Sequence, residues 1–143
     1  MRRVTVTIAA ASLVLMSGIA ATAIAEKPVV QNAAGWTLPA DADDKKNPLP
    51  VDEQLLATGK AVFKDKCVRC HGPGGVGDGP DADPDSEDMD LTNAKRADRN
   101  SDGVMFYKVW NGRKKPKMPA FSAEITEEQA WAVVAYAQSL RKK

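Results

Sequence analysis

The chain of 143 residues contains little cysteine and histidine, with two of the first and one of the second. A structural zinc site typically needs four Cys or His ligands, so three such residues are too few to form one. Basic residues are not in excess either, since the formal net charge is +1, and a nucleic-acid-binding protein needs a clear basic excess. The chain also shows no internal repeat and no convincing strand pattern, so the sequence predicts an all-α domain.

The three scarce residues all fall within residues 67–71, which read CVRCH. A C-x-x-C-H run is the attachment signature of a c-type haem. Cys67 and Cys70 fall on the same side of one helical turn, where their thiols can form thioethers with two vinyl groups at one edge of a porphyrin. His71 follows directly and offers a nitrogen to the iron. A thioredoxin-like pair would need flanking strands, and a disulfide would leave the histidine unexplained, so the motif predicts one covalently bound haem c.

The N-terminus has the pattern of an export signal. Arg2 and Arg3 precede an apolar stretch over residues 4–25, which ends in an A-x-A cleavage pattern at Ala25 and is typical of a secretory signal peptide. We expect residues 1–25 to be removed and the mature protein to lie in the periplasm, which agrees with haem attachment outside the cytoplasm. The alternative is an uncleaved membrane anchor, since a stretch of this length could cross a bilayer.

Residues 26–51 form an extension that is rich in Pro, Ala and Asp and has no helical period. Such a segment is either a linker or an arm packed on the domain. Trp36 and Leu38 favour the packed arm, because exposing both side chains to water would cost hydrophobic free energy.

Three later segments have apolar residues at three- and four-residue steps and predict helices over residues 52–66, 102–111 and 126–140. Start signals accompany each segment: Asp52 and Glu53 suit the start of the first, Ser101 is the N-cap of the second, and Glu127 and Glu128 lie in the first turn of the last. The segments between them, residues 72–90 and 113–122, are rich in Gly, Pro and charged residues, and predict loops.

Four of these features together resemble class I cytochrome c. They are the helix that contains Gly59 and Phe63, the haem motif, the loop over residues 117–121, which reads KMPAF, and the last helix with residues 131–136, which read WAVVAY. The resemblance covers residues 52–140 in the order of that family. It predicts a cytochrome c domain over residues 52–143.

The resemblance implies that the first and last helices cross and that the haem lies in a pocket between helices and loops. Gly59 and Phe63 would then meet Val133 and Tyr136, and the glycine would allow the close approach. In this family a glycine-proline pair supplies the carbonyl that binds the ring of the iron-ligating histidine. The segment Gly79-Pro80 resembles that pair.

The second axial ligand of the iron has to be a residue other than histidine. Within the family a methionine is the leading choice, since a thioether favours reduced iron and raises the reduction potential. Met118 is the predicted ligand, because Pro116 and Pro119 flank it and restrict its loop. Met89, Met105 and an open iron position stay as alternatives.

A basic cluster precedes the predicted ligand. It is either a solvated loop or a docking surface that steers an acidic redox partner, and it consists of Arg113, Lys114, Lys115 and Lys117.

These observations predict an electron carrier rather than an enzyme, with a single haem c and with His71 and Met118 as iron ligands. We expect a monomer that exchanges electrons with a periplasmic dehydrogenase or a membrane respiratory complex and with a terminal acceptor, and that binds no nucleic acid. One alternative is a haem enzyme or gas-binding protein with a labile sixth site. The other is a cytochrome subunit of a dehydrogenase complex.

Overall fold

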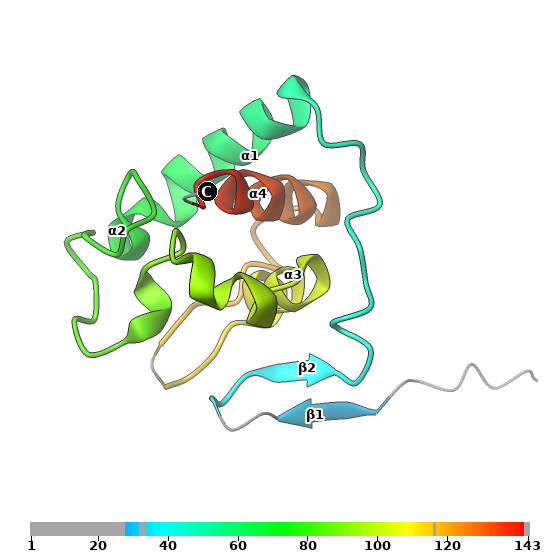
Figure 1. The fold of residues 1–143 in the computed structure, drawn as a ribbon, viewed down its shortest axis with the longest axis horizontal. Helices are drawn as coiled ribbons and strands as arrows, with labels where there is room; N and C mark the ends of the chain where they lie inside the picture. The colour runs from blue at the N-terminus through cyan, green and yellow to red at the C-terminus, as the bar shows by residue number, and fades with distance from the viewer. Residues whose placement is uncertain (1–27, 32–33, 116, 142–143) are drawn as a thin grey trace, which may run out of the picture.

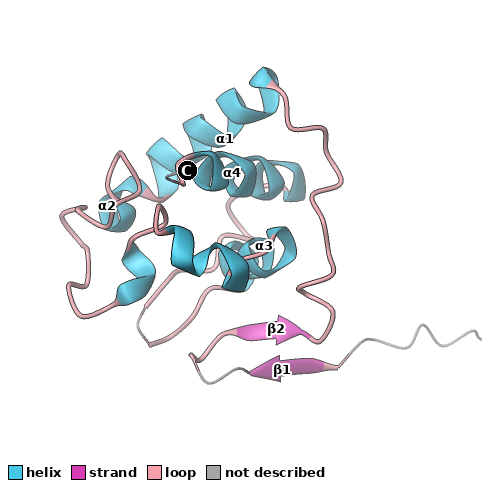
Figure 2. Cartoon of the chain, in the orientation of Figure 1, coloured by secondary structure: helices cyan, strands magenta, loops and turns pink. Residues whose placement is uncertain are grey.

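The computed structural model describes residues 28–31, 34–115 and 117–141. Within these residues the fold consists of four α-helices, with two short 3-10 helices and one small hairpin (Figure 1). The α-helices are α1 (Glu53–Lys66), α2 (Val68–His71), α3 (Asp102–Asn111) and α4 (Glu127–Ser139). The hairpin consists of β1 (Val29–Gln31) and β2 (Thr37–Pro39), and the 3-10 helices are η1 (Glu87–Met89) and η2 (Ala94–Arg99). Helices dominate the described part of the chain (Figure 2), so the predicted all-α class is confirmed.

The ends of the three long helices follow from local capping. The Asp52 side chain accepts a hydrogen bond from the Leu55 amide at the start of α1, and Thr126 forms a reciprocal capping box with Gln129 at the start of α4. Gly112 ends α3 with a φ of 63°, in the left-handed region that favours glycine. These helices lie within one residue of their predicted bounds because each signal acts within a single turn of the chain.

Helices α1 and α4 cross in close contact (Figure 1). A Cβ placed on Gly59 would lie 2.1 Å from the carbonyl oxygen of Ala132 and 2.8 Å from Cβ of Tyr136. The rings of Phe63 and Tyr136 meet edge to face, with 5.4 Å between their centroids. The predicted crossing is therefore confirmed. The glycine, however, lies against Ala132, and not against Val133 as expected.

The main core lies between α3 and α4. The rings of Phe106 on α3 and Trp131 on α4 stack with 4.2 Å between their centroids, and both side chains are buried. Stacked aromatic pairs add to the free energy gained from burying their area. This contact fixes α3 beside α4 and leaves the other sides of α3 for the N-terminal extension and the loops.

The described residues of the extension, 28–31 and 34–51, form a packed arm, as Trp36 and Leu38 had indicated. Trp36 is only 3% exposed, and the Asn47 side chain donates to the carbonyl of Trp131 over 3.2 Å. Figure 1 shows the hairpin beneath α3. The sequence predicted no strand, and strands of three residues are too short for an alternating pattern to reveal them. The proposed signal peptide, residues 1–25, lies outside the described residues.

The segment between α2 and α3 folds back against the haem motif. The Leu91 amide donates to the carbonyl of Gly75 over 2.7 Å, and the Gly77 amide donates to the carbonyl of His71 over 2.9 Å. These bonds bring η1 next to α2, although the sequence predicted only a loop. Among the described residues, we find no helix that combines the length and the apolar character needed to cross a membrane.

Candidate haem site

The haem motif forms a short helix directly after α1. Cys67 separates α1 from α2, its amide bonds to the carbonyl of Phe63, and both cysteines are free thiols. Burial, with smaller contributions from Cys70 and Asp65, raises the pKa of the Cys67 thiol to about 12. The described residues contain no cluster of three or more Cys, His, Asp or Glu side chains that could hold a metal ion. These side chains therefore do not form a conventional metal site by themselves.

The imidazole of His71 is buried and oriented by a backbone carbonyl. Its exposed fraction is 9%, and Nδ1 lies 2.8 Å from the carbonyl oxygen of Met89. Burial lowers the pKa of His71 below 6.5, against smaller opposing effects of the Met89 bond and of Asp88. Burial thus favours the neutral form of the ring. Because a carbonyl only accepts, Nδ1 carries the proton and Nε2 keeps the lone pair that can bind a metal.

The prediction that Gly79-Pro80 supplies this carbonyl is wrong. A Cβ on Gly79 would lie 2.3 Å from the carbonyl oxygen of Arg69, and the Asp81 amide donates to the same oxygen over 2.8 Å. This pair therefore covers the end of α2, while the acidic loop continues past it and returns to the histidine at Met89. Its place along the chain resembled the family's pair, but the length of the loop moved the contact to a later residue.

The loop that contains Met118 is tied back to the end of α3. The backbones of Arg113 and Met118 exchange two hydrogen bonds of 2.8 and 2.9 Å, and the Phe121 amide donates to the carbonyl of Val109 over 3.1 Å. A Cβ on Gly112 would lie 2.5 Å from the Met118 carbonyl oxygen. The loop is thus positioned by backbone bonds as well as by Pro119, while Pro116 lies outside the described residues.

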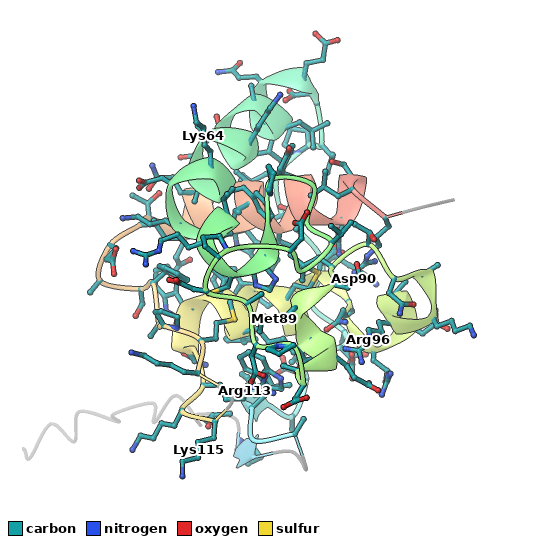
Figure 3. All side chains as sticks on the ribbon, turned by 90° about the vertical axis from the view of Figure 1, so that its left-hand side faces the viewer. Lys64, Met89, Asp90, Arg96, Arg113 and Lys115 are labelled. Carbon is teal, nitrogen blue, oxygen red and sulfur yellow. The ribbon has the colours of Figure 1, made fainter. Side chains whose placement is uncertain are left out.

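One cavity brings the predicted site residues together. Cys67, Cys70, His71 and Met118 all line it. Its apolar lining comes from α1, α3, α4 and the Met118 loop, through Phe63, Met105, Val109, Phe121, Val133, Val134 and Ala137. Met89 also lines the cavity, and Figure 3 shows it near the centre of the face that carries the site. The sequence indicated the thiols, the imidazole and the methionines, whereas no local pattern marks the walls between them.

One wall of this cavity is strongly basic, and the sequence did not reveal it. Arg96, Lys108 and Arg113 line it. Arg113 forms an ion pair of 2.9 Å with Asp88 and donates to the carbonyl of Ala34 over 2.8 Å. Figure 3 shows Arg96 beside Met89 and Arg113 below it. Arg113 was expected in the exposed basic cluster, but its side chain is only 4% exposed, because the ring of Trp36 covers it.

The residues of the cavity fit a haem c. Two thiols and a neutral imidazole with a free Nε2 lie in one turn at its wall, and the apolar lining suits a porphyrin ring. The basic wall suits the two carboxylates of the same cofactor, because a buried charge needs an opposite charge or strong hydrogen bonds.

Comparison with known proteins agrees with this fit. The family described as cytochrome C oxidase, cbb3-type, subunit III matches residues 54–136, which is more than half of the chain. Among solved structures, the chain is similar to a protein of the reducing HAO-like complex of Kuenenia stuttgartiensis, with a TM-score of 0.56 and 27% identity. The match covers 66% of this chain and 47% of that one, so this chain spans about half the length of that relative.

Cytochrome c domains carry haem c and transfer electrons through it, which agrees with the fit of the cavity. The fold, the cavity and the match over residues 54–136 lead to one conclusion: the chain belongs to the cytochrome c family described as cytochrome C oxidase, cbb3-type, subunit III, and is a small c-type cytochrome.

Proposed function

We propose that this protein is a periplasmic electron carrier with a single haem c, bound covalently through Cys67 and Cys70 and ligated by His71 and Met118. The observation that supports it best is that both thiols, the oriented imidazole and this methionine line one largely apolar cavity. When bound, the haem supplies a one-electron couple between ferric and ferrous iron. If His71 and Met118 both bind the iron, no position would be left on it for a substrate, and the protein would only transfer electrons.

The choice of Met118 over the other two methionines rests on their surroundings. Sδ of Met105 lies 3.2 Å from a guanidinium nitrogen of Arg141, and the side chain is buried in the core between α3 and α4. Met89 lies next to His71, since its own carbonyl accepts the bond from that ring. Met118 lies on a separate segment, the loop tied back to the end of α3, and would supply the second ligand from there.

The protein's own contribution is to hold the ligands and to limit contact with water. The Met89 carbonyl maintains the orientation of His71, and the backbone bonds between Arg113 and Met118 position the thioether. Phe63 and Phe121 are buried apolar residues of the cavity wall. A low-dielectric surrounding of this kind strengthens the effect of each nearby charge on the reduction potential.

Residues 1–25 would direct export and be removed, residues 26–51 would form the extension, and residues 52–143 would form the cytochrome domain. The partners would be redox proteins of the periplasm or membrane. Lys114, Lys115 and Lys117 are exposed and lie in the loop that leads to Met118, where positive charge would steer an acidic partner toward the site. Contacts of this kind are small and short-lived.

The test is the optical spectrum of protein exported by a host with haem-attachment machinery, together with the Met118→Ala variant. We expect a low-spin haem with the weak red band of a sulfur–iron(III) bond. The variant should lose this band, bind carbon monoxide or cyanide and have a lower potential. Met89→Leu and Met105→Leu serve as matched controls and should keep the band. A band that survives in Met118→Ala would contradict this ligand, and a colourless wild type would contradict the function.

A second candidate is a subunit of a larger redox complex. The similarity to a protein of the HAO-like complex favours it, since the match covers only 47% of that protein. Purification of the tagged protein from its native cells at low and at high salt distinguishes the two. A partner that stays bound at high salt supports the subunit, since transient electrostatic contacts dissociate when salt screens them.

A further inference from the structure

We propose that the N-terminal extension is part of the haem site: its residues Ala34 and Trp36 hold Arg113 in place, and Arg113, together with Arg96 and Lys108, binds the two carboxylates of the haem. The proposal rests on the proposed function, because it assumes that the cavity holds a haem. It concerns residues 34–36, which lie outside the region that matches the family, residues 54–136.

The charges at the basic wall are not balanced. Arg96, Lys108 and Arg113 line the cavity, and the acid that both arginines share is Asp88, with distances of 3.1 and 2.9 Å. Arg96 also contacts Glu87, whose side chain is 83% exposed. At this wall the three cations thus meet one half-buried and one exposed carboxylate, which leaves positive charge there for an anionic ligand.

Lys108 has an amide partner but no carboxylate partner among the described residues. Its ammonium donates to Oδ1 of Asn100 over 2.6 Å, and among the described residues no carboxylate lies within ion-pairing distance of it. Burial lowers the pKa of Lys108, and Arg113, Arg96 and Arg99 add to this effect, while Asp88 opposes it. An ammonium has three donors, and a buried cation is costly without a counter-ion. A haem carboxylate would supply that counter-ion.

The layout of the site also suits the shape of the cofactor. Both thiols lie at one wall of the cavity, and a porphyrin of this type has its vinyl groups at one edge and its carboxylates on the other side. A second, polar hollow lies against the basic wall and shares Trp36, Asp88, Arg96, Asn100, Lys108 and Arg113 with the apolar cavity. Carboxylates that reach this wall would pass from the apolar cavity toward a polar one.

The extension determines where Arg113 lies. Its guanidinium carbon is 4.0 Å from the centroid of the Trp36 ring, and the carbonyl of Ala34 accepts from the same guanidinium over 2.8 Å. The ammonium of Lys108 lies 4.9 Å from the centroid of that ring as well. Cation–π contacts of this geometry stabilise a buried cation. Trp36 is therefore a positioning residue for two of the three cations, and the hairpin supports it from outside the cytochrome domain.

The test measures the reduction potential and the redox-difference infrared spectrum of the exported, haem-loaded protein, with haem carboxylates labelled by isotope. The variants are Arg113→Gln and Lys108→Gln, and the exposed Lys114→Gln removes the same charge as a matched control. Removing a cation close to the haem disfavours the reduced state, so the potential should fall. We expect the fall to be about fourfold larger for the two wall variants than for the control, since charges near a protein interact through an effective dielectric of about 20 rather than 80. The labelled carboxylate bands should shift in the wall variants alone.

Trp36→Ala tests the positioning role, because it leaves all charges in place. We expect its carboxylate bands to move in the direction seen in Arg113→Gln, and Trp36→Phe, which keeps an aromatic face, to restore them. If Arg113→Gln does not fold, Lys108→Gln still removes one cation of the wall and gives both readouts. If the wall variants bind haem fully but have the same potential and carboxylate bands as the control variant, the inference is overturned. A wild type without haem would instead overturn the proposed function.

Discussion

Gly77 and Met89 lie against each other, so that a Cβ placed on Gly77 would come within 2.9 Å of Cβ of Met89. The φ of Gly77 is 84°, a conformation that L-residues with a side chain adopt at a cost. This contact sets the distance between the acidic loop and α2, and hence the position of the carbonyl that orients His71.

We therefore predict that Gly77→Ala weakens the bond between His71 and the Met89 carbonyl. The strain and the contact should lower the free energy of unfolding by about 1–3 kcal/mol, and the nitrogen NMR signal of Nδ1 should shift. Pro80→Ala is the comparison, because Pro80 belongs to the pair that the sequence had suggested for this role. An Nδ1 signal that moves in Pro80→Ala and stays in Gly77→Ala would show that the orientation of the ring does not depend on Met89.

The crossing of α1 and α4 gives a second prediction. Gly59→Ala improves the intrinsic helix propensity by about 1 kcal/mol, but its methyl group would meet the Ala132 carbonyl oxygen at 2.1 Å. Because both partners belong to packed backbones, the helices would have to move apart. We expect a net loss of about 2 kcal/mol, measured by denaturant unfolding. Gly74→Ala is the control, since no atom lies within 4 Å of its added Cβ; an equal loss there would remove the steric explanation.

A third prediction concerns acid stability. Burial favours the protonated form of Asp102, but hydrogen bonds of 2.9 Å from the backbone amide of Asn47 and from the Gln138 side chain, together with the charges of Lys46 and Arg141, outweigh it and bring the pKa of this carboxyl below 3.8. A lowered pKa means that the carboxylate stabilises the fold above about pH 3.8 and that this contribution is lost as the pH falls through the pKa of the folded state.

Asp102→Asn should therefore lower the free energy of unfolding at pH 7 by about 1 kcal/mol, a value reduced because the group is only partly buried. The difference from the wild type should shrink when unfolding is measured below about pH 3.8. The exposed Asp98 provides a matched acid in Asp98→Asn, for which we expect no change. A difference for Asp102→Asn that is constant with pH would assign its effect to packing instead of charge.

The exposed lysines of the Met118 loop give a fourth prediction. Replacement of Lys114, Lys115 and Lys117 by Gln should slow the oxidation of the reduced protein by an anionic iron–cyanide complex by roughly tenfold at low salt. The rates of variant and wild type should converge at high ionic strength, and a neutral oxidant should not distinguish them. Equal rates with the anionic oxidant at low salt would mean that these lysines form only a solvated loop.

Short-range signals made several features predictable from the sequence. The thiols and the imidazole of residues 67–71 share one turn, so their spacing alone indicated the cofactor. The caps at Asp52, Thr126 and Gly112 each act within a few residues, and the helix bounds followed from them. Gly59 predicted a close crossing because a glycine inside a helix is unfavourable unless packing requires it.

Contacts between distant segments were decided by the tertiary structure alone. Arg113 looked like a member of a surface cluster until the fold placed it between Trp36 and Asp88, and His71 found its partner at Met89 instead of Gly79-Pro80. No local pattern encodes such contacts. They depend on the way in which the long loops fold back and on which buried charges pair once the helices have packed. The chemistry of the haem motif is thus local, whereas the walls that surround it are set by the free energy of the whole packed chain.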